Sequence, residues 1–259
     1  MSHDDRDPSS VADSGSDPKG GRRPKKPMPL WQETILLLAL ALGLAVVIKA
    51  VLLQAFYIPS ESMEPGLVVN DRILVQKVSY WGDGTPQRGD VVVFEDPGGW
   101  LGAAESVGPS NLLTRGMAAI GLYPAGGHLV KRVIGVEGDV IECCDRQGRL
   151  KVNGVALDED AYINDSPGLV CNGPMLGPEC RWKAGPVPAG NVFVMGDNRD
   201  RSADSTVHMC RTGQTDCVPG QEFVDTDLVV GKVFALVWPA GHARWVTRPE
   251  GLADVPDPS

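Results

Sequence analysis

The stretch ILLLALALGLAVVIKAVLL, residues 35–53, divides the 259-residue chain into a short N-terminal part and a long C-terminal part. Lys49 is its only charged residue. As a helix rising ~1.5 Å per residue it would extend about 28 Å, close to the ~30 Å hydrocarbon core of a bilayer. Aromatic residues of the kind that anchor helices at the membrane surface flank it, namely Trp31, Phe56 and Tyr57. We therefore predict one transmembrane helix, with an anchor over residues 31–55.

A cleaved secretory signal and a buried core helix are the two alternatives for this segment. The run is longer than the roughly 7–15 apolar residues typical of a signal peptide. The residues that end it, Leu53-Gln54-Ala55, do not place small side chains at both the −1 and −3 positions of a cleavage site. We expect an uncleaved span.

The N-terminal tail, residues 1–30, is rich in Ser, Gly, Pro and Asp and poor in large apolar residues, so we expect it to be disordered. Its second half, residues 18–30, contains basic residues and no acidic ones: Lys19, Arg22, Arg23, Lys25 and Lys26. Basic residues beside a span remain in the cytoplasm. The pattern predicts a single-pass protein of the cell membrane, with a cytoplasmic N-terminus and the rest of the chain on the extracytoplasmic face.

The cysteines agree with that orientation. All six follow the span: Cys143, Cys144, Cys171, Cys180, Cys210 and Cys217. An oxidising compartment permits disulfides. The pairs Cys171–Cys180 and Cys210–Cys217 enclose short loops and are the simplest candidates, although six cysteines allow fifteen connectivities. Zinc binding is the rival interpretation, but the sequence has no CxxC pair, so we expect no metal site.

Beyond the span the sequence predicts mostly β structure. Short runs rich in Val and Ile, separated by turn residues, lie at 72–78, 90–94, 129–134, 139–142, 191–195 and 228–238. Residues 97–127 look like an insertion with one short helix near 112–120, and residues 247–259 look like a loose acidic tail. The formal net charge of −9 argues against a nucleic-acid partner, whose phosphates require a basic face.

Four polar motifs remain to be explained. They are IPSESMEPGL at 58–67, RGDVVVF at 88–94, VKRVIGVEGD at 130–139 and GDNRDRSADS at 196–205. Each alone has a structural interpretation: a turn leaving the membrane, a turn before a strand, an edge strand with an exposed lysine, and a solvated loop. Together and in this order, after an N-terminal anchor, they resemble bacterial type I signal peptidases. The resemblance covers most of the chain except residues 97–127 and 143–190.

The resemblance implies a mostly β catalytic domain of the signal-peptidase/LexA-like type, over residues 56–246, with a smaller lobe inserted at about 143–190. It implies a membrane-bound serine endopeptidase that removes signal peptides from preproteins after small residues at −3 and −1. A serine hydroxyl needs a base to take its proton. None of the four histidines lies in a recognisable triad motif, whereas a lysine can serve where burial disfavours its charged form.

By resemblance, Ser62 is the nucleophile and Lys131, in an apolar run, is the general base. The Ser60 hydroxyl joins the Ser62 backbone N–H in an oxyanion hole. Ser202 orients the lysine, and Asp197 and Asp204 support the loop that carries it. Small apolar substrate pockets are expected at Ile58 and Val130. Four positions depart from the commonest family pattern without touching the nucleophile or base: Gly66, Glu137, Arg201 and Thr206.

The expected enzyme needs no cofactor, acts as a monomer, and has preprotein signal peptides and the lipid membrane as partners. Two other classes stay open. A self-cleaving Ser/Lys protease of the repressor type would lack the anchor and would need an Ala-Gly site in a linker. A membrane-anchored β-domain acting as a binding or assembly module would explain the span and the cysteines, but not Ser62 and Lys131 within two specific motifs.

Overall fold

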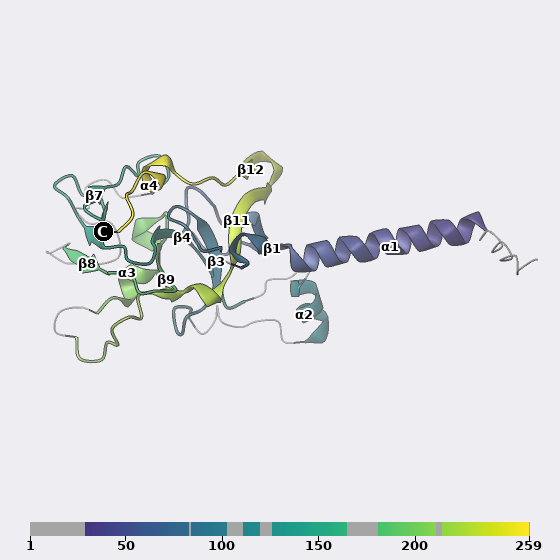
Figure 1. Ribbon diagram of the computed structural model, residues 1–259, viewed down its shortest axis with the longest axis horizontal. Helices are drawn as coiled ribbons and strands as arrows, with labels where there is room; N and C mark the ends of the chain where they lie inside the picture. Colours follow the sequence, from purple (N-terminus) through teal and green to yellow (C-terminus); the bar gives the residue numbers. More distant parts are fainter. Residues whose placement is uncertain are drawn as a thin grey trace, which may run out of the picture. The chain divides into compact units, whose positions relative to one another are not determined.

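The computed structural model describes residues 29–82, 84–102, 111–119, 126–164, 181–210 and 214–258 (Figure 1). Its internal contacts separate residues 1–43 from residues 44–259, and we describe the two units individually. Helix α1 is Leu30–Val51, and the side chains of residues 30–48 are all exposed. A helix that is apolar on all sides and unburied is typical of a membrane span. Among the described residues it is the one helix long and apolar enough for that role.

The expected anchor extended to residue 55, but the helix ends earlier. Strand β1, Leu53–Tyr57, follows it almost directly and pairs with β2, Arg72–Gln76. The apolar run therefore contains both the end of a helix and the start of a strand. Periodicity cannot separate the two where every residue is apolar.

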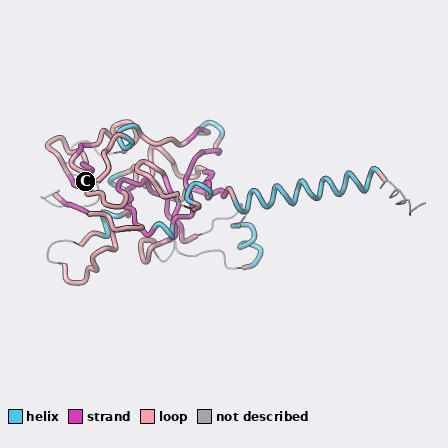
Figure 2. The backbone as a smooth tube through the Cα atoms, in the orientation of Figure 1, coloured by secondary structure: helices cyan, strands magenta, loops and turns pink. Residues whose placement is uncertain are grey.

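The main sheet is antiparallel throughout, with strand order β1-β2-β11-β3-β4-β9-β10 and β12 paired to β11. Its remaining strands are β3 Val91–Glu95, β4 His128–Gly135, β9 Asn191–Met195, β10 Val224–Asp225, β11 Val229–Trp238 and β12 Arg244–Trp245. The mostly β fold class expected from the sequence is confirmed. The tube view shows how few helical segments interrupt the strands after α1 (Figure 2).

A second sheet, with strand order β7-β6-β5-β8, forms the smaller lobe. Its strands are β5 Ile141–Cys143, β6 Lys151–Val152, β7 Val155–Ala156 and β8 Trp182–Ala184. Its apolar side chains pack on Phe193 and Met195 of β9, which ties the lobe to the main sheet.

The C-terminal residues, expected to be loose, pack against this lobe instead. Leu252, in the short helix α4 (Glu250–Ala253), and Val255 are 1% and 5% exposed and join the same apolar cluster. Arg88 donates to the Val255 carbonyl at 3.0 Å. The acidic and proline-rich composition of this segment predicts a loose tail. Burial of two apolar side chains holds it in place instead.

The other helices are short. They are α2 Leu112–Ala119, within the region expected to hold a helix, α3 Ser205–His208, and the 3₁₀ turns η1 Val78–Tyr80, η2 Arg199–Arg201, η3 Thr226–Leu228 and η4 Ala240–His242. Cys210 is bonded to Cys217, the pairing expected from the sequence, with Cα atoms 5.4 Å apart. Cys143 is bonded to Cys144, which the sequence did not suggest. Cys171 and Cys180 lie outside the described residues.

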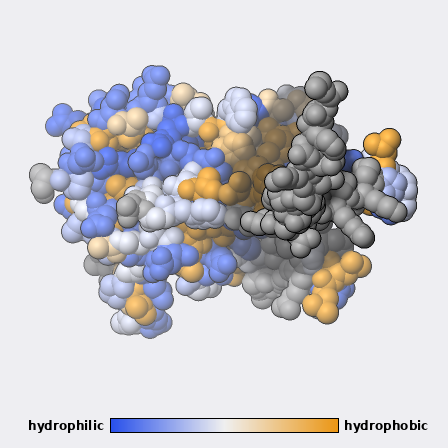
Figure 3. Space-filling model, turned by 45° about the vertical axis from the view of Figure 1, so that its right-hand side comes forward, coloured by the Kyte–Doolittle hydropathy of each residue, from blue (hydrophilic) through white to orange (hydrophobic). Residues whose placement is uncertain are grey.

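Two apolar clusters cover the two faces of the main sheet. Alternate residues of β3 belong to different clusters, because successive side chains of a strand point to opposite faces. Val91 and Val93 join the cluster around Ile58, and Val92 and Phe94 join the other. Apolar side chains also remain at the surface, where they gather beside a larger hydrophilic area (Figure 3).

Candidate active site

Ser62 lies in the turn region between β1 and β2. Two buried side chains on either side of it, Ile58 and Met63, are 2% and 1% exposed and belong to one apolar cluster. The chain then closes through a hydrogen bond from the Leu67 N–H to the Met63 carbonyl at 2.8 Å. The serine is 6% exposed and is held in place from both ends of the turn.

Lys131 lies on β4 and is 4% exposed. Its Nζ donates to the Ser62 Oγ at 2.8 Å, although the two residues are 69 positions apart in the chain. The Ser60 Oγ is 3.2 Å from the same Ser62 oxygen. The structure thus brings together the two residues expected to form the dyad and the hydroxyl expected beside them.

Arg132, the next residue of β4, binds a carboxylate. Its Nε and Nη2 donate to the two Asp197 oxygens at 2.7 and 2.6 Å, and its Nη1 donates to the Gly89 carbonyl at 2.9 Å. Burial alone would lower the pKa of Arg132, but the Asp197 charge and hydrogen bonds outweigh burial and raise it. Asp197 therefore compensates a buried guanidinium beside the dyad.

The loop after β9, residues 196–205, folds around Asp204. This carboxylate is fully buried and accepts from the Gly196 N–H at 2.9 Å and from the Ser202 hydroxyl at 2.5 Å. Thr206 adds its N–H and its hydroxyl at 3.0 and 2.7 Å. Hydroxyl and backbone N–H donors thereby surround the buried carboxylate.

At Gly196 this loop packs closely against residues 60–63, here called the nucleophile turn. A Cβ at this position would clash with both the Ser202 hydroxyl and the Ser62 carbonyl. The Asn198 N–H donates to that Ser62 carbonyl at 3.0 Å, and its side-chain amide donates to the Glu61 carbonyl at 3.1 Å. Ser202, 4% exposed, is thus brought beside Ser62 as well as Asp204.

The two expected pocket residues share one apolar cluster. Ile58 is buried in it and Val130, the neighbour of Lys131, packs against it partly buried. At the exposed rim, Arg201 forms an ion pair with Glu61, so this departure from the family pattern has a partner in the nucleophile turn.

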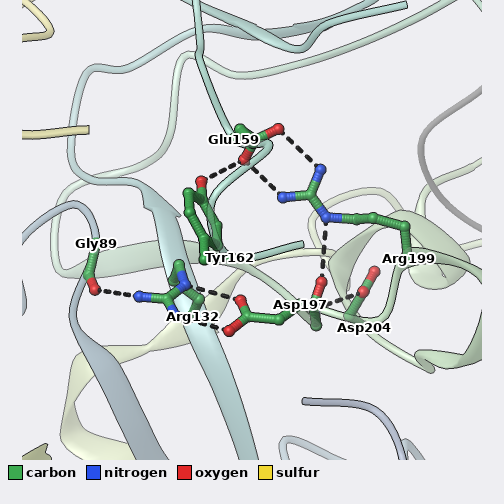
Figure 4. Close-up of polar contacts among 8 residues, drawn as sticks. Gly89, Arg132, Glu159, Tyr162, Asp197, Arg199 and Asp204 are labelled. Atoms are coloured by element: carbon green, nitrogen blue, oxygen red, sulfur yellow. Dashed lines mark hydrogen bonds and ion pairs between the residues drawn. The ribbon is translucent and has the colours of Figure 1, made fainter. Parts of the chain in front are cut away.

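Sequence reasoning missed two residues behind the dyad, Glu159 and Tyr162 (Figure 4). Arg199 is fully buried and donates to the two Glu159 oxygens at 2.9 and 2.6 Å, and the Tyr162 hydroxyl donates to Glu159 at 2.5 Å. Burial raises the pKa of Glu159, but Arg199 and Tyr162 outweigh it and the net shift is downward. No motif surrounds either residue, so a single sequence held no signal for them.

The described histidines are engaged away from Ser62. His128 packs against Phe56 with the rings tilted and their centroids 5.3 Å apart, and His208 stacks on Trp100 at 4.3 Å. His242 contacts Asp71 at 3.1 Å, and His3 lies outside the described residues. Within the described part of the chain, no group of three or more His, Cys, Asp or Glu side chains is arranged to hold a metal ion.

Comparison with known proteins matches residues 31–238 to the signal peptidase family, peptidase S26. Signal peptidase I of Mycobacterium tuberculosis is 38% identical over 250 residues, covering 90% of this chain and 82% of its own. Probable signal peptidase I of Mycobacterium leprae is 36% identical, with 87% and 81% covered, and signal peptidase I of Leptolyngbya laminosa is 36% identical, with 71% and 73% covered. The chain therefore belongs to the signal peptidase family, peptidase S26, a family of serine protease hydrolases.

Proposed function

We propose that the protein is a membrane-bound serine endopeptidase that removes N-terminal signal peptides from preproteins, with Ser62 as nucleophile and Lys131 as general base. The observation that carries the proposal is the 2.8 Å contact between Lys131 Nζ and Ser62 Oγ, both buried. The names of the relatives supply the substrate class.

The proposed reaction begins with a neutral Lys131, which burial favours over the ammonium. The Ser62 hydroxyl then donates along the same 2.8 Å contact and loses its proton to Nζ as Oγ attacks the scissile carbonyl carbon. Lys131 next protonates the leaving amine, and the acyl group stays on Ser62. Water, deprotonated by the lysine, hydrolyses this ester and frees the enzyme.

Two donors are proposed for the oxyanion of the tetrahedral intermediate. They are the Ser62 backbone N–H and the Ser60 hydroxyl, whose oxygen is 3.2 Å from Ser62 Oγ. One such donor contributes about 3–4 kcal/mol to the transition state. Ser202, held by Asp204 beside the Ser62 carbonyl, is proposed to orient the lysine, with Asp197 supporting the loop.

Specificity for small side chains at −1 and −3 is proposed to depend on exclusion. Ile58 and Val130 belong to one packed cluster, so a bulky substrate side chain would clash there. An extended substrate would gain its register through backbone hydrogen bonds to a strand. Helix α1 is proposed as a single anchor, with the basic residues before it in the cytoplasm.

The test is cleavage of a preprotein with an Ala-x-Ala site by the detergent-solubilised protein, with sequencing of the new N-terminus. Cleavage after the second Ala by the parent and its loss in Ser62→Ala and Lys131→Met would support the proposal. A folded parent that cleaves nothing would refute the proposal and favour an anchored binding module. In such a module, Lys131→Met would leave partner binding intact.

A further inference from the structure

We propose that residues 159–164, here called the clamp, position the nucleophile turn and the 196–205 loop for catalysis, with Glu159 and Tyr162 as positioning residues. The clamp follows β7, outside all four motifs, and no expected site residue lies in it. This inference rests on the proposed function, because it assigns a role in the Ser62/Lys131 reaction.

The first contact of the clamp is with the loop that follows β9. Glu159, 4% exposed, binds the fully buried Arg199 through two hydrogen bonds of 2.9 and 2.6 Å. Arg199 Nε also donates to the Gly196 carbonyl at 3.1 Å, so one guanidinium joins the clamp to the start of the loop. The charges of this pair are compensated only while the loop keeps this position.

The second contact is made by Tyr162. Its hydroxyl donates to Glu159 at 2.5 Å, and its ring lies under the Arg132 guanidinium, 4.6 Å from carbon to centroid. Arg132 is the strand neighbour of Lys131. Figure 4 shows the ring between Glu159 and Arg132, with Asp197 beside the guanidinium. One aromatic side chain therefore connects the two buried arginine–carboxylate pairs.

The backbone of the clamp supplies a third set of contacts. The Asn164 N–H donates to the Asp197 carbonyl at 2.8 Å, and the Arg199 N–H donates to the Asn164 carbonyl at 3.1 Å. Ile163 forms an antiparallel bridge with Pro65, just after the nucleophile turn. The clamp thus hydrogen-bonds to the loop and pairs with the chain just after the turn.

These contacts end one residue from the reacting atoms. Asn198, which lies between the two loop residues that bond to the clamp, donates its N–H to the Ser62 carbonyl at 3.0 Å. A shift of about 1 Å in such a support can cost on the order of a hundredfold in rate. The clamp acts through this bond and through Arg132, which makes it a positioning element rather than a catalytic one.

The chain offers a matched control for a buried arginine–carboxylate pair. Arg88 Nε and Nη2 donate to the two Asp139 oxygens at 2.6 Å each, and the side chains are 9% and 0% exposed. The contacts of Asp139 are with Val136, Asn153 and Arg88, where the lobe meets the C-terminal segment. Asp139→Asn removes the same kind of charge as Glu159→Gln, but away from the nucleophile turn.

The experiment compares the full-length parent, Glu159→Gln, Tyr162→Phe and Asp139→Asn, solubilised in detergent. Cleavage of the Ala-x-Ala preprotein gives kcat, KM and the acid limb of the pH–kcat profile, and thermal unfolding gives the stability of each protein. We expect Glu159→Gln to lower kcat about tenfold or more with KM within about threefold. Its acid limb should move to lower pH, because the buried Arg199 charge that loses its carboxylate disfavours a second positive charge on Lys131. Tyr162→Phe should act in the same direction and more weakly, while Asp139→Asn should lower stability and leave the profile in place.

The outcomes separate this proposal from the function on which it rests. A parent that cleaves nothing refutes the proposed function and the clamp with it. An active parent with the same kcat and pH profile in Glu159→Gln as in Asp139→Asn refutes the clamp alone. Where Glu159→Gln does not fold, Tyr162→Phe decides, since it removes one oxygen atom: an unchanged profile overturns the clamp, and a shifted one supports it.

Discussion

Lys131 and Arg132 are neighbouring cations on one strand, and both are buried at 4% and 5% exposure. Strand alternation sends their side chains to opposite faces of β4, where their cross-strand partners are Val92 and Val91. Lys131 meets the Ser62 hydroxyl, while Arg132 meets the Asp197 carboxylate in a two-point ion pair. Sequence distance between the two is minimal, yet their surroundings differ completely.

The difference shows how one strand separates chemistry from support. A lysine can lose its proton when buried, whereas an arginine stays charged and needs a carboxylate. A buried ion pair contributes little net stability, but removal of one partner is costly because the other charge remains buried. Loss of the cation at Lys131 should therefore lower the rate and leave stability unchanged, whereas loss of the cation at Arg132 should lower stability.

The largest effect should follow Lys131→Met. In the proposed mechanism this variant has no base to take the Ser62 proton, so kcat should fall by about a thousandfold or more. Thermal unfolding should stay close to that of the parent, because the replacement fills similar space with no charge. Preprotein cleavage and calorimetry on the same sample test both expectations. Substantial residual cleavage would show that another group takes the proton.

Arg132→Met should lower stability, which Lys131→Met should not. Asp197 would be left as a buried charge without its guanidinium, and we expect a loss of about 3–5 kcal/mol in the free energy of unfolding. The double variant Arg132→Met with Asp197→Leu should recover much of this loss, since no charge is left unpaired. Denaturant unfolding gives the values. Equal stability in Lys131→Met and Arg132→Met would remove the distinction between the two faces.

The sequence predicted the central strands because their apolar runs are bounded by turn residues. β3, β4, β9 and β11 all lie where Val-rich runs were found. β1 was missed because its apolar residues continue those of the helix. The C-terminal segment was missed because two buried side chains, Leu252 and Val255, among acidic residues and prolines give no periodic pattern.

The site divides in the same way. The contact between Ser62 and Lys131 could be expected because both residues lie in motifs specific enough to indicate a family. Glu159 and Tyr162 reach the site through space, from a segment whose local sequence resembles any loop. Their partners, Arg199 and Arg132, were visible as motif residues, but a single sequence cannot say which carboxylate compensates a buried arginine.

The second buried arginine–carboxylate pair, Arg199 with Glu159, can be tested through the pH dependence of stability. Arg199 and Tyr162 hold the pKa of Glu159 below its ordinary value despite burial. A carboxylate with a lowered folded-state pKa contributes stability that is fully present above the unfolded pKa of about 4.3 and is lost as the pH falls through the folded value. The difference in unfolding free energy between the parent and Glu159→Gln should therefore narrow below about pH 4. If the difference in unfolding free energy stayed constant down to a pH at which Glu159 is fully protonated, the lowered pKa of Glu159 would be contradicted.

The smallest effect should follow Thr206→Val, which tests how far one hydroxyl supports the buried Asp204. The Thr206 hydroxyl donates to Asp204 at 2.7 Å, and the backbone N–H of the same residue donates to the same oxygen at 3.0 Å. Valine keeps the shape and the backbone donor and removes one hydrogen bond to a charged group, so the loss should be about 1–2 kcal/mol. Asp204 would still accept from Gly196 and Ser202, so kcat should change less than about twofold. Urea unfolding and preprotein cleavage measure the two quantities. A large fall in kcat at this modest cost in stability would contradict the expectation. It would mean that the threonine hydroxyl is the main group holding Asp204, and with it Ser202, in place. The support of Ser62 and Lys131 would then extend one residue beyond the 196–205 loop.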